Sequence, residues 1–263
     1  MPLLFFDIGN TNVKIGLYRE ESGLTSYVLP TPRDGTADQL GLDITTLLVR
    51  EAQHPATLTE ILAVSVVPPI NPLLRQACVR FLGRAPRFVP DDLPVPLENR
   101  YAKPEEVGAD RLVAAYAARR ARSERSVISV DFGTATTFDV VQDSNYLGGL
   151  ICPGVLSSAR ALAADTAKLP RIDLTPQSLT LTIGRSTAES LNQGMLFGFA
   201  AMTEGILARL SKHLGEVPAV VATGGFASQL ARVCPAIEDV RPELLLEGLR
   251  LVYEESTRDA SRP

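Results

Sequence analysis

Two short stretches of this chain combine a carboxylate with glycine and small polar residues, in an order that suits a phosphate-binding turn. The first is Asp7–Asn12, and a degenerate echo of it follows at Asp131–Thr136. Glycine lets the backbone approach a ligand closely and take a positive φ, while Thr and Asn supply short hydrogen-bonding groups. Because the pattern occurs twice, we expect two halves of one nucleotide site, which is typical of a kinase.

The first stretch and the residues after it carry donors for the β- and γ-phosphates of a nucleotide, namely Asn10, Thr11, Asn12 and Lys14. Asp7 would repel a phosphate, so we expect it to hold hydrated Mg²⁺, which prefers carboxylate and water oxygens. The same residues also fit an ordinary Gly-Asn hairpin turn with a capping aspartate. The echo favours the functional interpretation.

Two further stretches could complete such a site. Thr223-Gly224-Gly225 follows an apolar run and precedes a helix, which places backbone against a base or a phosphate, although it is also common as a tight turn. Gly108–Arg111 puts an aspartate in the first turn of a helix, where it is usually only a cap. A kinase for an alcohol needs a base on the attacking hydroxyl, and Asp110 could be that base. Arg111 could pair with an anionic substrate, with Asp110 or with Glu106.

The elements that must position these residues follow the order strands first and helices afterwards, twice over. We expect strands at Leu3–Phe6, Val13–Tyr18, Ile61–Val67, 126–141 (two strands around a turn), Tyr146–Ile151 and Ala219–Ala222. Helices are expected at Leu73–Leu82, Ala109–Ala121, 155–165, 186–213, Glu243–Tyr253 and directly after Gly225, and a proline-rich extended loop at 84–104. This order predicts an α/β fold of two lobes with mixed sheets, residues 1–115 and 116–263, connected by the helix at Ala109–Ala121.

Composition excludes several classes of function. A net charge of −4 leaves no overall basic field for nucleic acid or an acidic membrane. The arginines at 119, 120, 122 and 125 could form a phosphate patch or simply a solvated helix end. Three cysteines and two histidines lie far apart in the sequence and match no metal spacing or disulfide framework. No signal peptide or membrane span is visible, so we expect a cytoplasmic protein.

The combination of motifs resembles type III pantothenate kinases. The matching stretches are Asp7-x-Gly9-Asn10-Thr11, Ser65-Val66-Val67-Pro68, Gly108-Ala109-Asp110-Arg111, Asp131–Thr137, Gly148-Gly149-x-x-x-Pro153-Gly154, Leu169-Pro170, Gly184-Arg185-Ser186-Thr187 and Thr223-Gly224-Gly225. Individually they are loose patterns, but they occur in order from residue 3 to about 253. Lys103 departs from the family, where Asn or Asp is expected, and could alter how the carboxylate of the substrate is steered.

The resemblance implies the fold of the acetate and sugar kinase, chaperone and actin superfamily, in which ATP lies between two ribonuclease-H-like lobes. It implies ATP binding by Asp7, Ile8, Gly9, Asn10, Thr11, Asn12, Val13, Lys14 and Thr134, with Gly224 and Gly225 near the adenosine. It implies a pantothenate pocket lined by Tyr101, Gly108, Ala109, Asp110 and Arg111, with Thr187 contributing, from the partner subunit in one arrangement. Asp110 would be the general base, Asp131 would hold potassium or ammonium, Mg²⁺ would accompany ATP, and the protein would be a homodimer.

The reaction implied is transfer of the γ-phosphoryl group of ATP to pantothenate, giving 4′-phosphopantothenate, the first step of coenzyme A biosynthesis. One alternative is another small-molecule kinase of the same fold, acting on a sugar or an acid. Another is a non-catalytic ATP-binding regulator, which the presence of Asp110 disfavours because a pure binder needs no base.

Overall fold

The computed structural model describes residues 1–164, 175, 176 and 178–260. The motif Leu169-Pro170 and the last residue of the helix expected at 155–165 lie outside these residues. The described chain forms two compact units. The first comprises Met1–Leu97, Glu105–Ala117 and the chain from Leu245 onward, and the second comprises Glu98–Pro104 and Ala118–Leu244.

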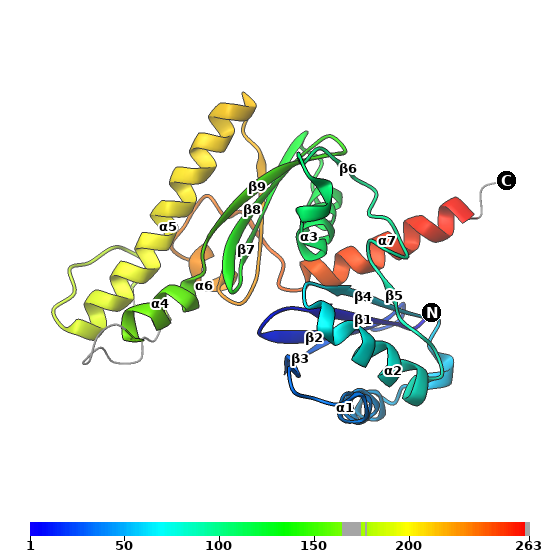
Figure 1. Ribbon diagram of the computed structural model, residues 1–263. Helices are drawn as coiled ribbons and strands as arrows, with labels where there is room; N and C mark the ends of the chain where they lie inside the picture. Colours follow the sequence, from blue (N-terminus) through cyan, green and yellow to red (C-terminus); the bar gives the residue numbers. More distant parts are fainter. Residues whose placement is uncertain (165–174, 177, 261–263) are drawn as a thin grey trace. The chain divides into compact units, whose positions relative to one another are not determined.

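A five-stranded sheet is the centre of the first unit (Figure 1). Its strands are β1 (Leu3–Ile8), β2 (Asn12–Arg19), β3 (Gly23–Pro30), β4 (Glu60–Ser65) and β5 (Arg87–Phe88), in the spatial order β3-β2-β1-β4-β5. Strands β1, β2 and β3 are antiparallel neighbours, whereas β4 runs parallel to β1 and β5 parallel to β4. The sheet is therefore mixed, as the sequence predicts.

Helices cover both faces of this sheet, which explains why β1 is apolar without alternation. Leu4 and Phe6 face α1 (Ala37–Arg50) and α2 (Asn71–Leu82), whereas Leu3 and Phe5 face α3 (Ala109–Ala121) and α7 (Leu244–Ala260). Successive side chains of a strand point to opposite faces, so four consecutive apolar residues serve two cores. Gly83 ends α2 with a φ of 73°, a conformation that glycine adopts without strain.

The second unit repeats this topology. Its sheet contains β6 (Glu98–Asn99), β7 (Ser126–Phe132), β8 (Ala135–Gln142), β9 (Asn145–Pro153), β10 (Ala219–Thr223) and β11 (Asp239–Val240), in the order β11-β10-β7-β8-β9-β6. The run β9-β8-β7-β10-β11 reproduces β3-β2-β1-β4-β5 of the first unit, with the same antiparallel and parallel pairings. The expected duplication of two α/β lobes is confirmed at the level of strand order.

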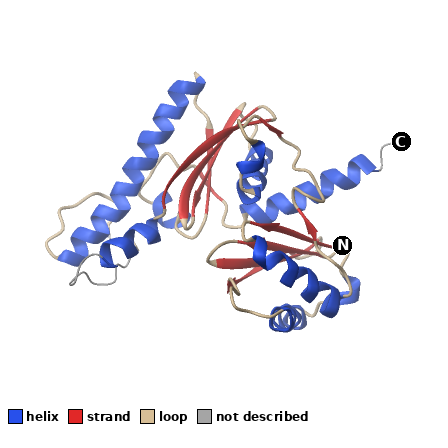
Figure 2. Cartoon of the chain, viewed as in Figure 1, coloured by secondary structure: helices blue, strands red, loops and turns tan. Residues whose placement is uncertain are grey.

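One face of the second sheet is apolar, whereas the other carries polar as well as apolar side chains. Ile128, Val130 and Phe132 pack with α4 (Val155–Ala164), α5 (Thr187–Leu214) and α6 (Ala227–Ala231). Figure 2 shows these helices flanking the strands of this unit. Ser129 and Asp131 alternate with the apolar residues along β7 and therefore point to the opposite face. The candidate site residue Asp131 lies on that face.

The structure differs from the sequence-based expectations at several elements. Strand β3 and helix α1 were not predicted, although Leu40, Ile44 and Leu48 have helical spacing behind the N-cap Thr36. The expected loop at 84–104 contains β5 and β6, two-residue pairings between its prolines. Short 3-10 turns also occur at 55–57, 68–70 and 104–106. The last helix belongs to the first unit rather than to the lobe 116–263, because Leu246, Leu249 and Val252 bury themselves beside Leu3 and Phe5.

Candidate active site

The turn between β1 and β2 is a tight hairpin with an exposed tip. The backbone N–H of Gly9 donates to the carbonyl of Asn12 at 3.0 Å, and Asn10, Thr11 and Asn12 are exposed. Cross-strand pairing places Asp7 directly opposite Lys14, so both side chains point to the same face of the sheet. The structure therefore brings together the carboxylate, the ammonium and the small polar residues that the sequence assigned to one phosphate turn.

Two residues that the sequence did not single out brace this turn from the end of β3. The hydroxyl of Thr31 donates to the carbonyl of Gly9 at 2.6 Å, and its backbone N–H donates to the carbonyl of Thr11 at 3.0 Å. Nη2 of Arg33 donates to the carbonyl of Asn10 at 3.0 Å. The carbonyls of Gly9, Asn10 and Thr11 are thereby all occupied by hydrogen bonds from residues that follow β3. Only the pairing of β3 with β2 could have revealed this support.

The second turn, between β7 and β8, is one residue shorter. Phe132 pairs with Thr136 across the hairpin, whereas Ile8 pairs with Val13 in the first, and the N–H of Gly133 reaches the carbonyl of Ala135 at 3.1 Å. The hydroxyl of Ser157 at the start of α4 donates to the carbonyl of Thr134 at 2.7 Å. The echo in the sequence thus corresponds to two related turns of unequal length, not to an identical repeat.

The carboxylate of Asp131 lies against the glycine turn that follows β10. Gly224 has a φ of 90°, and a Cβ at that position would overlap Oδ1 of Asp131. A Cβ on Gly133 would lie 3.3 Å from the same oxygen. Gly225, by contrast, has open space where a Cβ would be. The structure therefore unites two separate motifs, Asp131–Thr136 and Thr223–Gly225, around a single carboxylate oxygen.

Asp110 lies in the first turn of α3, with its carboxylate above the backbone of Gly108. A Cβ on Gly108 would be 2.5 Å from Oδ1 of Asp110, and the N–H of Arg111 donates to this oxygen at 2.7 Å. Burial raises the pKa of Asp110 above its ordinary value, opposed by that hydrogen bond and by the positive charge of Arg111. A carboxylate with a raised pKa is a stronger base than an exposed aspartate.

The segment after β4 connects Asp110 with the first turn. The N–H of Val66 donates to the carbonyl of Ile8 at 3.0 Å, and Cγ1 of Val66 would be 3.6 Å from a Cβ on Gly108. The end of β1, this segment and the start of α3 thus pack together within the first unit. Asp110 and the turn Asp7–Lys14 therefore both lie beside the segment that contains Val66.

Tyr101 belongs to the second unit, beside β9. Its ring centroid lies 6.5 Å from that of Tyr146, and the edge of its ring would be 3.1 Å from a Cβ on Gly148. Thr187 is the exposed first residue of α5, directly after the N-cap Ser186, whose hydroxyl accepts from the N–H of Glu189 at 3.2 Å. No contact between Tyr101 and Thr187 is seen among the described residues.

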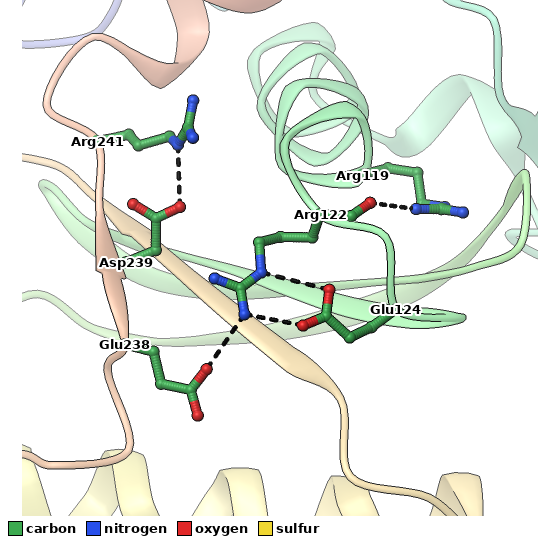
Figure 3. Close-up of polar contacts among 6 residues, drawn as sticks. All are labelled: Arg119, Arg122, Glu124, Glu238, Asp239 and Arg241. Carbon is green, nitrogen blue, oxygen red and sulfur yellow. Dashed lines mark hydrogen bonds and ion pairs between the residues drawn. The ribbon is translucent and has the colours of Figure 1, made fainter.

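The arginines at the end of α3 make hydrogen bonds and ion pairs with other residues of this chain, which argues against a phosphate patch (Figure 3). Arg119 donates to the carbonyl of Arg122 at 2.7 Å, and Arg122 pairs with Glu124 at 2.9 Å and with Glu238 at 3.3 Å. Arg125 pairs with Asp143 at 3.3 Å. The solvated helix end is therefore the better interpretation of this cluster.

Metal binding by protein carboxylates alone is not a feature of the part of the chain that the structure describes. Within it, no three His, Cys, Asp or Glu residues lie close enough together to hold an ion. Mg²⁺ in nucleotide sites needs only one or two carboxylates, since water and phosphate oxygens complete its octahedron. Asp7, half-buried beside the exposed turn, fits such a role. The described helices also include none that is both long and apolar enough to cross a bilayer.

The chain is similar in sequence to known proteins over nearly its whole length. Residues 3–209 match the sequence family described as type III pantothenate kinase. Proteins of that name from Nitratidesulfovibrio vulgaris (strain Miyazaki F) and Anaeromyxobacter dehalogenans are 59% and 40% identical to this chain. The alignments cover 98% and 96% of this chain, and 98% of each relative.

Solved structures of lower similarity share the fold. A ROK hexokinase from Thermus thermophilus superimposes with a TM-score of 0.53 at 18% identity, covering 97% of this chain and 100% of the hexokinase. The activator of 2-hydroxyisocaproyl-CoA dehydratase from Clostridium difficile, with bound ADPNP, gives 0.52 at 12% identity, covering 100% and 98%. The two mixed sheets flanked by helices are therefore those of the actin-like ATPase and sugar kinase fold.

Proposed function

Because this chain belongs to the type III pantothenate kinase family, we propose that Asp110 is the general base of its reaction, within a site that includes Asp7–Lys14. The reaction itself is the ATP-dependent phosphorylation of pantothenate to 4′-phosphopantothenate, which begins coenzyme A biosynthesis. The observation that carries the proposal is the position of Asp110. Its partly buried carboxylate lies above Gly108, with a raised pKa, and is linked to the phosphate turn through Val66.

In this proposal Asp110 removes the proton from the hydroxyl of pantothenate that attacks ATP. As the pantothenate oxygen forms its bond to the γ-phosphorus of ATP, Asp110 accepts the proton from that hydroxyl, and ADP leaves. Arg111, next to Asp110 on α3, supplies a positive charge for the carboxylate of the substrate, with Gly108 and Ala109 forming the backbone wall beside it. General base catalysis of this kind contributes about 10²–10⁴-fold to the rate.

The phosphate turn binds and orients ATP. The backbone N–H groups of Asn10, Thr11 and Asn12 and the ammonium of Lys14 donate to phosphate oxygens, while Ile8, Gly9 and Val13 shape the turn. A kinase of this fold uses ATP with a divalent metal ion, which neutralises charge on the phosphates. We assign Asp7 to this ion, Mg²⁺, through water. Thr134 contributes to the phosphates from the second turn, and Gly224 and Gly225 lie at the adenosine.

A monovalent cation, potassium or ammonium, belongs at Asp131 in this proposal. Such cations take carboxylate and carbonyl oxygens, and Oδ1 of Asp131 lies where it would overlap a Cβ on Gly224 and 3.3 Å from where a Cβ on Gly133 would be. The cation would offset the negative charge that ATP brings to the second turn.

We further propose that the protein is a homodimer. Large apolar side chains are exposed on β9 and before α5, among them Ile151, Leu181 and Ile183, which are 66%, 68% and 91% exposed. Apolar surface of this kind is typical of association. Thr187 follows Ile183 closely in the chain and would join the pantothenate pocket from the partner subunit. Pantothenate and ATP are its ligands, and the net charge of −4 favours neither nucleic acid nor membrane. A cytoplasmic location accords with these ligands.

The test is release of ADP that depends on pantothenate, measured with the native protein and with Asp110→Asn, with and without potassium. We expect the variant to bind ATP but to lose most turnover. Near-native turnover by the variant would remove Asp110 from the role of base, and ADP release with other acceptors in place of pantothenate would point to a different substrate. Sedimentation velocity tests the dimer, which a monomer at micromolar concentration would exclude.

A further inference from the structure

A buried carboxylate that phosphoryl transfer does not use lies in the middle of β8. Asp139 is 2% exposed and accepts a hydrogen bond from the hydroxyl of Tyr146 at 2.7 Å. The hydroxyl of Thr137 donates to its other oxygen at 3.1 Å. Asp139 pairs with Ser129 of β7 and lies on the same strand face as Thr137, opposite the apolar core of the second unit.

Burying a carboxylate costs desolvation free energy unless its oxygens are hydrogen-bonded. Apolar residues in place of Asp139 and Tyr146 would avoid that cost. Tyr146 is fully buried, and its hydroxyl reaches Asp139 within the sheet from β9. This hydrogen bond fixes the ring of Tyr146 along the strand face, because rotation or displacement of the ring would leave the carboxylate less well satisfied. The ring of Tyr146 is thus held in a fixed orientation.

The ring of Tyr101 packs against the ring of Tyr146. Its ring is tilted by 43° to the ring of Tyr146, at 6.5 Å between centroids. Gly148, two residues further along β9, has a φ of 113°, and its missing Cβ leaves the space that the ring of Tyr101 occupies. The backbone holds the same register, since the N–H of Arg100 donates to the carbonyl of Tyr146 at 2.9 Å and Oδ1 of Asn99 accepts from the N–H of Tyr101 at 3.0 Å.

We infer that Asp139 and Tyr146 are positioning residues for pantothenate specificity, because they hold the ring of Tyr101 in the orientation that contacts the substrate. The inference rests on the proposed function, which places Tyr101 in the pantothenate pocket. The order of contacts is Asp139 to Tyr146 to Tyr101, and neither Asp139 nor Tyr146 touches a reacting atom. Residues of this kind affect how well the substrate is held more than how fast the bound substrate reacts.

The first test is Tyr146→Phe, which removes one hydroxyl and keeps the ring. Loss of a buried hydrogen bond that orients a binding residue should raise the KM for pantothenate by about three- to tenfold. The kcat at saturation, the KM for ATP and the potassium response should stay unchanged. Asp139→Asn keeps an oxygen acceptor for Tyr146 and should give a smaller rise in the same KM, which makes it the second variant if Tyr146→Phe folds poorly.

Tyr27→Phe is the matched control. The hydroxyl of Tyr27 donates to Glu51 at 2.5 Å in the first unit, so this variant also loses a tyrosine–carboxylate hydrogen bond. It should lower thermal stability without changing the KM for pantothenate. If Tyr146→Phe behaves like Tyr27→Phe, with a lower Tm and an unchanged KM, the pair is only structural and the inference is overturned.

Tyr101→Ala separates failure of the inference from failure of the proposed function. If Tyr101→Ala leaves the KM for pantothenate unchanged, Tyr101 is not in the pocket, and the assignment under the proposed function falls together with the inference. If Tyr101→Ala raises this KM, the double variant Tyr101→Ala/Tyr146→Phe decides the rest. We expect it to be no worse than Tyr101→Ala alone, because Tyr146 acts through Tyr101. Independent, multiplied effects would overturn the inference and leave the proposed function intact.

Discussion

The carboxylate of Asp110 occupies the space that a side chain at Gly108 would need: a Cβ on Gly108 would be 2.5 Å from Oδ1 of Asp110. A glycine is therefore needed at this position because it leaves room for the carboxylate of Asp110. The carbonyl of Gly108 accepts the N–H groups of Arg111 and Leu112 at 3.1 and 3.3 Å, so the same residue directly precedes α3 and accepts hydrogen bonds from its first turn. The start of a helix and the position of the proposed base are thus set by one residue without a side chain.

Gly108→Ala should consequently displace the carboxylate of Asp110 and lower kcat. A shift of about 1 Å in a reacting group can cost about 10²-fold in rate. Steady-state kinetics with pantothenate measure this effect, and the double variant Gly108→Ala/Asp110→Asn is the control. If Gly108→Ala acts through Asp110, it should cost little in the Asp110→Asn background. An equal loss in both backgrounds would show that Gly108 has another function.

Asp110→Asn should lose turnover without losing stability. Burial raises the pKa of Asp110 in the folded protein, so the protonated form favours folding, and ionisation costs stability as the pH rises through the folded pKa. At neutral pH the ionised carboxylate therefore destabilises the fold, and the neutral amide should remove that cost. We expect kcat to fall by about 10²–10⁴-fold while Tm stays the same or rises. A large drop in Tm would attribute the lost activity to unfolding instead.

The pH dependence of kcat should follow the same group. Asp110 must be ionised to accept a proton, so activity should decline as the pH falls through its pKa. Because this pKa is raised, the decline should begin at a higher pH than the ordinary aspartate value of 3.8 would give. Rates at saturating substrate in buffers of constant ionic strength test this. A profile that stays flat down to the ordinary aspartate range would contradict the role.

Much of the fold could be predicted because local signals and tertiary contacts agree. Helix α3 has the predicted bounds Ala109–Ala121, and Gly83 ends α2 as its position after an apolar periodic run indicates. Two related turns were visible in the sequence because each combines an apolar strand with Asp and Gly. Helix α1 was equally visible in the spacing of Leu40, Ile44 and Leu48, and could have been found.

The remainder depends on contacts between residues far apart in the chain. Thr31 reaches Gly9 only because β3 pairs with β2, and no local pattern predicts that pairing. Helix α7 joins the first unit because its backbone at Gly248 packs against Val113, where a Cβ would lie 2.6 Å from a carbonyl oxygen. Periodicity shows that a helix has an apolar face but does not show what covers that face. The proximity of Asp131 and Gly224 could not be predicted either, because it depends on the pairing of β7 with β10.

Asp131→Ala should weaken activation by potassium. The carboxylate lies against Gly133 and Gly224, at the proposed cation site, and removing it takes away the negative charge that a cation needs. The potassium concentration for half-maximal activity should rise, with saturating ATP and pantothenate. Asp143→Ala is a matched control, since Asp143 is an exposed aspartate paired with Arg125 in the same unit. An identical potassium response in native protein and Asp131→Ala would place the cation elsewhere.

Thr31→Val should weaken ATP binding through the first turn. Valine has nearly the shape of threonine but cannot donate to the carbonyl of Gly9, which the hydroxyl contacts at 2.6 Å. The turn would lose one of the bonds that orient its carbonyls, and the KM for ATP should rise by about two- to tenfold. Thr46→Val is the control, because its hydroxyl also donates to a backbone carbonyl, that of Leu42 at 2.8 Å, but within α1. Both variants lose a comparable bond, so only an effect specific to the turn separates them. Equal values of the KM for ATP in the two variants would mean that Thr31 merely stabilises the end of β3.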